Sequence, residues 1–379
     1  MRLSWIRNIF LFSTVVVLAS SCSQPEFSKD EPLIPAMRPA VYISGQNNFL
    51  FALDPRTGER IWERFFGVNN ILQEPIVLGD YTMVNSDEGV VVLGTEKGNI
   101  LDTIIELEFD GGKHRLAGQI SGEGTRIYSG TVDQKIVAYD YAKKELVWTN
   151  TVTFPTAMTS AGSFFGNLFI VHINGTLYAL NKNQGSEVSW TNNIGPVTNP
   201  VVSPPNLYAM DPTGTLHALD LESGIEIWTY ATGAPVKTSL VVYGGYIIYG
   251  SDDNYLYCID SISHVPRWTF KTAERIRGSA FGYEQAVYFG GYDHYVYSLD
   301  IIDGEINWKY RTGALISGSP IAHEGIVYFP SYDQHLYALD TSGSLRWKYR
   351  VNAPIDLSPV CNALNNKVIY PAPSGLSGQ

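Results

Sequence analysis

The chain has 379 residues but only three cysteines. Cys22 follows an apolar N-terminal segment, which leaves Cys258 and Cys361 for the remainder of the chain. Two cysteines are far too few to hold together a small disulfide-rich scaffold. Both lie in apolar, strand-like runs, so we expect small core residues, and the sequence leaves open whether the two are bridged.

Positive charge is also scarce. Lysine and arginine together number 26 against 37 aspartate and glutamate residues, which gives a formal net charge of −11. Nucleic acid binds basic surfaces through its phosphates, so an acidic chain argues against a nucleic-acid partner. The same negative net charge argues against direct binding to anionic lipid. We therefore expect the partner to be a protein or a polysaccharide.

Motifs of catalysis and metal binding are missing from the sequence. It has no Gly-Lys-Ser phosphate loop and no Gly-x-Ser-x-Gly nucleophile elbow. None of the seven histidines stands in close pairing with another and a carboxylate, as a metal site would require. We predict a protein that is not an enzyme and has no catalytic, cofactor-binding or metal-binding residues.

The one long hydrophobic run lies at the N-terminus. Arg2 and Arg7 give it a basic start, and residues 9–19 are almost wholly apolar, which falls short of the roughly 20 residues of a membrane-spanning helix. Small residues then lead into Cys22, a pattern that resembles the bacterial lipoprotein signal. We predict a signal peptide over residues 1–21 and lipidation of Cys22, with ordinary secretion as the alternative.

Residues 22–40 contain four prolines, several acids and few large apolar side chains. Such a composition predicts an extended tether between the membrane and the folded body. Ser23 and Gln24 follow the cysteine, which favours the outer membrane over the inner one. We expect a lipid-anchored protein of the cell envelope that is attached through acyl chains on Cys22 and faces the periplasm.

A block of the form Leu-Asp-x-x-x-Gly-x-x-x-Trp recurs down the chain. Its acidic or equivalent position, called the marker here, returns eight times at intervals of about 40 residues, at Asp54, Gly94, Asp140, Asn181, Asp220, Asp260, Asp300 and Asp340. Eight strand-rich units of this length predict an all-β fold, an eight-bladed β-propeller of four-stranded antiparallel blades, over residues 41–371. Residues 372–379 are then a tail.

One unit shows how its strands are expected to run. Residues 287–289 and 295–299 are aromatic and β-branched runs of strand length. A third strand begins near Trp308, and small residues suit 316–321 as an inner strand. The tryptophans of the units all stand seven to nine residues after the marker, so we predict that they pack between blades.

The turns between these strands have their own signature. Asp or Asn stands seven residues before most markers, where its side chain can bond the backbone of a tight turn. Glycine stands four residues after several markers, where a hairpin needs a positive φ. These polar and glycine residues are thus explained by turns.

Three departures from the repeat carry further expectations. The second unit lacks both the marker aspartate and the tryptophan, near Asp102, and an insertion after it enlarges a loop around residues 109–114. The chain begins with a second-type strand at 41–44 and ends after an inner-type strand at 357–360, so the two ends can complete one blade. Residues 367–370 form a surplus strand without a place in this scheme.

Segments such as residues 255–260 and 336–347 resemble the pyrroloquinoline-quinone-type propeller repeat, and the resemblance covers residues 41–370. The repeat is similar both to quinoprotein dehydrogenases and to the BamB-like outer-membrane assembly lipoproteins. Quinoprotein alcohol dehydrogenases have two adjacent cysteines at the cofactor and long added loops, whereas this chain has neither. The resemblance to the BamB-like proteins therefore implies a non-catalytic scaffold without a cofactor.

In that family the propeller helps the barrel-assembly machinery by binding a periplasmic domain of its central subunit. A loop with Leu-Arg-Gly takes part in this binding, and the nearest match here is Arg275-Ile276-Arg277-Gly278. The resemblance implies partner binding by Ile276 and Arg277, with Arg275 as a neighbour. The alternative is a solvated basic pair that leads into an inner strand.

Two other functions remain as alternatives. The 24 tyrosines include enough for a stacking surface at one mouth of the propeller, so a periplasmic or surface propeller that binds glycan or peptide is the second hypothesis. A quinoprotein dehydrogenase is the third.

Overall fold

The computed structural model describes residues 38–67, 70–150, 162–185, 188–198, 200–363 and 367–371. All of them belong to one compact unit, Ala36–Gln379. The predicted signal peptide, Cys22, most of the tether and the tail 372–379 lie outside the described residues. In the part that is described, no helix is long and apolar enough to cross a membrane.

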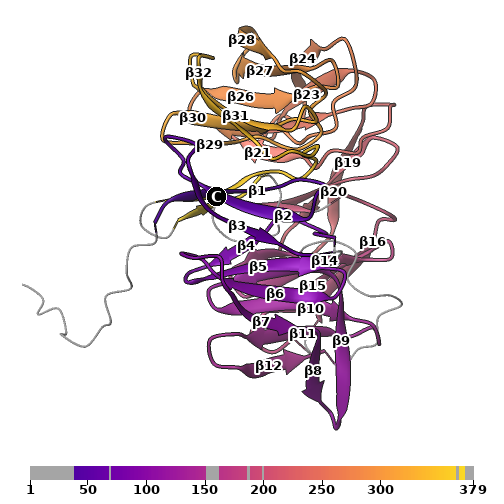
Figure 1. Ribbon diagram of the computed structural model, residues 1–379. Coiled ribbons are helices and arrows are strands. Elements are labelled where there is room, and N and C mark those ends of the chain that lie inside the picture. The colour runs from indigo at the N-terminus through magenta and orange to yellow at the C-terminus, as the bar shows by residue number, and fades with distance from the viewer. Residues whose placement is uncertain are drawn as a thin grey trace, which may run out of the picture. The chain divides into compact units, whose positions relative to one another are not determined.

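The described chain forms eight antiparallel sheets, six of four strands and two of five (Figure 1). In the first half these strands are β1 (Ala40–Ser44), β2 (Phe49–Leu53), β3 (Arg60–Phe65), β4 (Ile76–Leu78), β5 (Tyr81–Ser86), β6 (Gly89–Gly94), β7 (Ile100–Ile104), β8 (Glu106–Phe109), β9 (Gly112–Glu123), β10 (Arg126–Thr131), β11 (Ile136–Asp140), β12 (Glu145–Thr149), β13 (Ser163–Phe165), β14 (Leu168–Ile173), β15 (Thr176–Asn181) and β16 (Val188–Asn193).

In the second half the strands are β17 (Val201–Ser203), β18 (Asn206–Met210), β19 (Thr215–Asp220), β20 (Glu226–Ala231), β21 (Val241–Tyr243), β22 (Tyr246–Gly250), β23 (Tyr255–Asp260), β24 (Pro266–Lys271), β25 (Phe281–Tyr283), β26 (Ala286–Gly290), β27 (Tyr295–Asp300), β28 (Ile306–Arg311), β29 (Ile321–His323), β30 (Ile326–Pro330), β31 (His335–Asp340), β32 (Leu345–Arg350), β33 (Val360–Asn362) and β34 (Val368–Ile369). The eight-bladed β-propeller predicted from the repeat is thereby confirmed.

The inner strand of most blades is short, and β17, β21, β25 and β29 touch one another in succession. The second and third strands are buried on both faces, whereas the outer strands β20, β28 and β32 alternate between exposed and half-buried residues. This pattern arises because each sheet is sandwiched between two others. It explains the weak alternation of polar and apolar residues in the sequence.

The first and last strands of the chain close the propeller, as predicted. β1 pairs with β33, with Val41 opposite Cys361, and Figure 1 shows the indigo first strands beside the yellow end of the chain. The surplus strand is now placed, because β34 pairs with β33 as a fifth, innermost strand. Tyr370 follows it, and its buried hydroxyl donates to the carbonyl of Val77 and accepts from the amide of Val77 in the next blade, both at 3.0 Å.

The inner strands differ from the prediction. The sequence placed one at 316–321, but β29 begins only at Ile321, and the equivalent segments 238–241, 198–201 and 357–360 are likewise displaced toward their last residue. The reason is that Ser239, Ser279, Ser319 and Ser358, which precede these strands, do not join a ladder. Their backbone amides instead bond a side chain of the neighbouring blade.

These bonds form an interblade belt around the inner strands. Each joins one sheet to the next: Ser239 N to Ser279 Oγ (3.1 Å), Ser279 N to Ser319 Oγ (2.9 Å), Ser319 N to Ser358 Oγ (3.0 Å), Ser358 N to Glu74 Oε1 (3.1 Å), Ile120 N to Gln73 Oε1 (2.9 Å) and Gly162 N to Ser121 Oγ (2.7 Å). Serine is small enough for the crowded centre and still satisfies a buried amide.

The tryptophans join the outer parts of neighbouring blades, as predicted. Six donate their indole N–H to the carbonyl one residue after the next blade's marker: Trp62 to Thr95, Trp148 to Lys182, Trp190 to Leu221, Trp268 to Ile301, Trp308 to Thr341 and Trp347 to Pro55. Each ring also covers a glycine of positive φ in that blade: Gly98, Gly185, Gly224, Gly304, Gly343 and Gly58, respectively. We call this pairing the tryptophan–glycine lock.

The two remaining interfaces depart from the lock, one by replacing the glycine and the other by replacing both partners. Trp228 stacks at 4.4 Å on His264, which has the glycine's positive φ, and its indole nitrogen finds no acceptor within the described residues. Between the second and third units, Asp102 of the second stands for the tryptophan and Lys144 of the third for the glycine, and their side chains form a 2.6 Å ion pair. The weakest repeat in the sequence thus still has an interblade contact at this place.

The insertion around residues 109–114 is a hairpin of β8 and β9, with Asp110 and Gly111 at positive φ in its turn. His114 stacks on Phe109 at 3.7 Å and bonds Asp133 at 2.8 Å. The predicted enlarged loop is therefore ordered into strands.

Cys258 and Cys361 are both free and buried. Cys258 lies opposite Trp268 in the ladder of β23 and β24, where most other blades have alanine. Burial raises the pKa of each thiol to about 12. Both are small core residues, as expected, and they are not bridged.

The tryptophan–glycine lock leads to a stability prediction. A Cβ added at Gly304 would lie 2.5 Å from Trp268, whereas one at Gly233 would meet nothing within 4 Å, although both have a positive φ. Gly304→Ala and Gly233→Ala should share a backbone cost of about 1 kcal/mol. Gly304→Ala should lose a further roughly 1–3 kcal/mol from overpacking.

The measurement is the urea-unfolding midpoint of the two variants beside the parent chain. Equal midpoints for Gly304→Ala and Gly233→Ala would show that the packing of Trp268 does not require a glycine at position 304.

Candidate protein-binding surface

The three residues predicted to bind a partner lie in the connection between β24 and β25. This connection is fixed to two blades. The amide and hydroxyl of Thr272 both donate to the carbonyl of Asn254 at 2.9 Å, and the amide of Tyr292 in the next blade donates to the carbonyl of Arg275 at 3.0 Å. The loop is therefore presented in one conformation, which lowers the entropy cost of binding.

Ile276 is fully buried, and its amide donates to the carbonyl of Ser251 at 3.2 Å. The same position in other connections is occupied by buried apolar residues, namely Val236, Ile316 and Ile355. Its side chain therefore supports the loop from beneath, and the contact surface above it belongs to the two arginines.

Arg277 forms a bidentate pair with Asp252, with Nε 2.9 Å from Oδ1 and a terminal nitrogen 3.0 Å from Oδ2. Asp252 lies in the turn between β22 and β23. The hydrogen bond from Arg277 holds the pKa of Asp252 below its ordinary value, with further attraction from Lys237 and Arg275. Two donors in a rigid fork fix the orientation of the guanidinium.

Tyr292, in the turn between β26 and β27, supplies an aromatic face to the same cluster. The guanidinium carbon of Arg275 lies 4.8 Å from the centre of its ring and that of Arg277 lies 5.6 Å away. Both distances are within the range of cation–π attraction. Arg275 is exposed, so its charge stays available while the ring limits its motion.

The cluster is completed by Lys237, which is exposed and holds the position of Arg277 in the preceding connection. We call Lys237, Arg275, Arg277, Asp252 and Tyr292 together the basic surface. Three cations and one carboxylate give it a positive balance on a chain whose net charge is −11.

Sequence reasoning had found only part of this surface. The repeat period places Lys237 and Arg277 at equivalent positions 40 residues apart, so Lys237 could have been predicted from the sequence. Asp252 and Tyr292 come from turns of two different blades and gave no separate signal. Within the described ranges, no three His, Cys, Asp or Glu side chains gather as metal ligands would.

A sequence profile of the family described as outer membrane protein assembly factor BamB matches residues 21–230 and 226–368. The chain belongs to the BamB family. This confirms the resemblance drawn from the repeat.

Two members named outer membrane protein assembly factor BamB are distant relatives. The protein of Shewanella oneidensis is 22% identical over 235 residues, which are 59% of this chain and 59% of that protein. The protein of Yersinia pestis is 21% identical over 231 residues, 57% of this chain and 58% of its own length. The chain thus matches less than two thirds of the length of these BamB proteins.

Solved structures support the fold. BamB from Moraxella catarrhalis superposes with a TM-score of 0.61 at 16% identity, covering 79% of this chain and 97% of that one. A computationally designed protein, Ika8, gives a TM-score of 0.66 at 13% identity, covering 80% and 96%. Since a designed protein matches as well as a BamB, this likeness concerns the fold alone.

The Arg277–Asp252 pair predicts a pH dependence. Because the pKa of Asp252 is lower in the folded chain than the roughly 3.9 of an unfolded one, the pair adds to the free energy of unfolding above that pH. The contribution is lost as the pH falls through the folded pKa. Arg277→Gln should therefore cost about 1 kcal/mol at neutral pH and progressively less in acid.

Urea unfolding at neutral pH and at about one unit below the ordinary aspartate pKa measures this difference. Arg311→Gln is the control, since Arg311 is exposed and makes no side-chain hydrogen bond or ion pair among the described residues. A cost for Arg277→Gln that is the same at both pH values would contradict the assignment.

Proposed function

We propose that this BamB-family chain is a non-catalytic, lipid-anchored scaffold that takes part in the assembly of outer-membrane β-barrel proteins. It does so by binding a protein partner, a subunit of the barrel-assembly machinery, through the basic surface. The observation that carries the proposal is a preorganised group of arginine, lysine and tyrosine on an otherwise acidic molecule.

The composition of the basic surface is that of an interface centre. Arginine and tyrosine are the side chains most often found at binding hot spots. Arg277 is half-buried and oriented by Asp252, while Arg275 and Lys237 remain exposed at the edge. A cluster of positive charge on a chain of net negative charge favours an acidic partner segment and directs its approach.

The topology is compatible with attachment through the N-terminus. The described chain reaches the propeller at β1, which occupies the second position of its blade and starts at the end where inner and second strands connect. The basic surface lies at the other end, where second strands turn into third strands. An anchor on Cys22 would therefore leave the basic surface accessible to a periplasmic partner.

The quinoprotein alternative has no support in the core. Cys258 and Cys361 belong to different sheets and are both buried, so they do not form the adjacent pair of a quinone site. The carboxylates at the marker and turn positions accept hydrogen bonds that hold the turns together. Asp253, Asp293 and Asp333, for example, accept hydrogen bonds from the tyrosine four residues later.

Affinity purification of the acylated chain from crosslinked envelopes, followed by mass spectrometry, tests the proposal. The parent chain should recover a barrel-assembly subunit. Lys237→Glu combined with Arg275→Glu should reduce that recovery at least about tenfold, because two attractive charges become repulsive. Neither side chain hydrogen-bonds Asp252, so the Arg277 pair stays intact.

Lys97→Glu is the matched control, an exposed charge reversal in the turn between β6 and β7, at the opposite end of the blades from the basic surface. It should recover the subunit as the parent does. Full recovery by the Lys237→Glu and Arg275→Glu variant would remove the basic surface from the interface, and recovery of no barrel-assembly subunit by the parent chain would refute the proposed role.

A further inference from the structure

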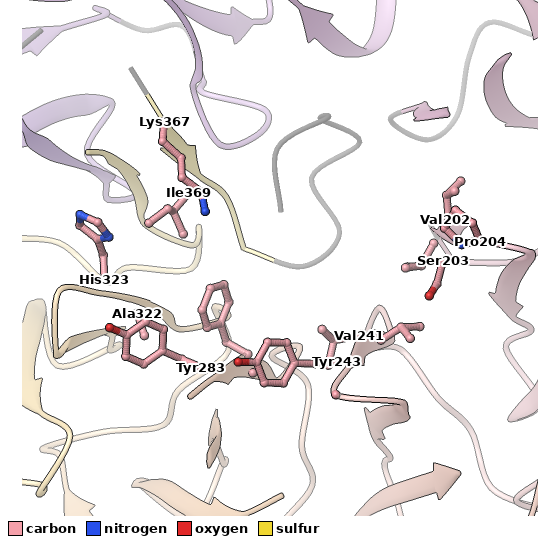
Figure 2. Close-up of a pocket in the computed structure, with 15 residues that line it drawn as sticks. Val202, Ser203, Pro204, Val241, Tyr243, Tyr283, Ala322, His323, Lys367 and Ile369 are labelled. Atoms are coloured by element: carbon pink, nitrogen blue, oxygen red, sulfur yellow. The ribbon is translucent and has the colours of Figure 1, made fainter. Parts of the chain in front are cut away.

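A cavity of about 520 Å³ opens among the inner strands of four consecutive blades (Figure 2). Its walls come from β17, β21, β25 and β29, and from β34, the innermost strand of the closing blade. It includes the start of the turn from β21 into β22, so it lies at the opposite end of the blades from the basic surface. Its volume is within the range of about 300–1,000 Å³ common for small-molecule sites.

Most of the cavity wall is apolar or aromatic. Valines of β17 and β21 form one side, and Figure 2 shows Ile369 of β34 and Lys367 just before that strand across from Tyr243 and Tyr283. The ring of Tyr243 covers Gly282, where an added Cβ would lie only 2.2 Å away. The glycine therefore leaves room for a flat aromatic wall.

The tyrosine hydroxyls of the wall already bond the backbone of the next blade. Tyr243 donates to the carbonyl of Glu284 at 3.1 Å, and Tyr283 accepts from the amide of Gly325 at 3.2 Å. A sugar or a peptide backbone needs several free hydrogen-bonding groups in its site. This wall has few to offer, so its chemistry favours an occupant with a long apolar body.

The charge of the cavity is the reverse of the molecule's. None of the described residues that line it is acidic, and Lys367 supplies its one permanent charge. Lys367 is exposed and has no ion pair or side-chain hydrogen bond among the described residues. His323 lies beside it.

The carboxylate next to His323 is already partly compensated. Glu324, with Oε1 3.6 Å from Nε2 of His323, pairs through its other oxygen with Arg56 at 3.1 Å. An apolar cavity with one unpaired cation at its edge selects an apolar molecule with a single negative charge.

We propose that this cavity binds a medium-chain alkyl carboxylate, with the chain against Val202, Tyr243 and Tyr283 and the carboxylate on Lys367. The site is independent of the basic surface and adds a small-molecule ligand to a protein-binding scaffold. A free fatty acid presents this chemistry.

Calorimetric titration with decanoate, and with 1-decanol as its neutral counterpart, tests the site. The protein is the chain from Ser23 onward, which lacks both the predicted signal peptide and the proposed acylation site and so needs no detergent. Decanoate should bind, and Lys367→Gln should weaken its binding about tenfold through loss of a charge-assisted bond. Binding of 1-decanol should not change in that variant.

Two further variants separate the site from the rest of the molecule. Lys97→Gln removes an exposed lysine without a side-chain partner among the described residues, and it should bind decanoate as the parent does. Ser203→Phe fills the cavity from β17 and should abolish binding of both ligands while keeping the parent's melting temperature. If it does not fold, the comparison of Lys367→Gln with Lys97→Gln still decides.

Three outcomes would overturn the proposal. The first is no decanoate binding at millimolar concentration, and the second is equal affinity of Lys367→Gln and the parent. The third is binding of oligosaccharides that decanoate does not compete with and Ser203→Phe abolishes, which would assign the cavity to a glycan.

Discussion

The structure depends on each sheet finding a partner on both of its faces. A blade of this propeller is apolar on either side, so it cannot be stable in water alone and must be covered by the two adjacent blades. The tryptophan–glycine lock meets this need at the outer strands and the interblade belt meets it at the inner ones. β1 paired with β33 extends the same contact across the two ends of the chain, so no blade is left with an uncovered face.

The fold was predictable because these contacts recur with the period of the sequence. A tryptophan, a marker aspartate and a turn glycine return at fixed offsets, and each offset corresponds to one contact between neighbours. The limits of the inner strands were not predictable, since a Ser-Gly-Ser-Pro run is equally suited to a ladder and to the belt. Only the positions of Ser279 and Ser319 in space show that their amides and hydroxyls bond across blades instead of along one.

In the basic surface, too, positions that recur with the repeat were predictable from the sequence, and contacts between different blades were not. Ile276 was singled out with its two neighbouring arginines, but the period marks it as a core position, because Val236, Ile316 and Ile355 recur there. Arg275 departs from its apolar equivalents, Arg277 has a basic equivalent in Lys237 alone among Lys237, Ser317 and Asp356, and such departures are where function can lie. Asp252 and Tyr292 also belong to the basic surface. In the sequence each is an ordinary turn residue, and only the folded structure shows that it lies beside an arginine.

The second unit shows what the fold requires at an interface. Its interface with the third unit has neither the tryptophan nor the glycine, and an Asp102–Lys144 ion pair stands in their place. If the lock were required for its own chemistry, this interface would be defective, yet Val92 and Ile127 on its two sides are buried as completely as their equivalents elsewhere. The propeller therefore needs a complementary pair at this point, not a particular one. Because of that tolerance, single blades can differ in sequence, with a basic surface at one end and a cavity at the other, while the propeller stays closed.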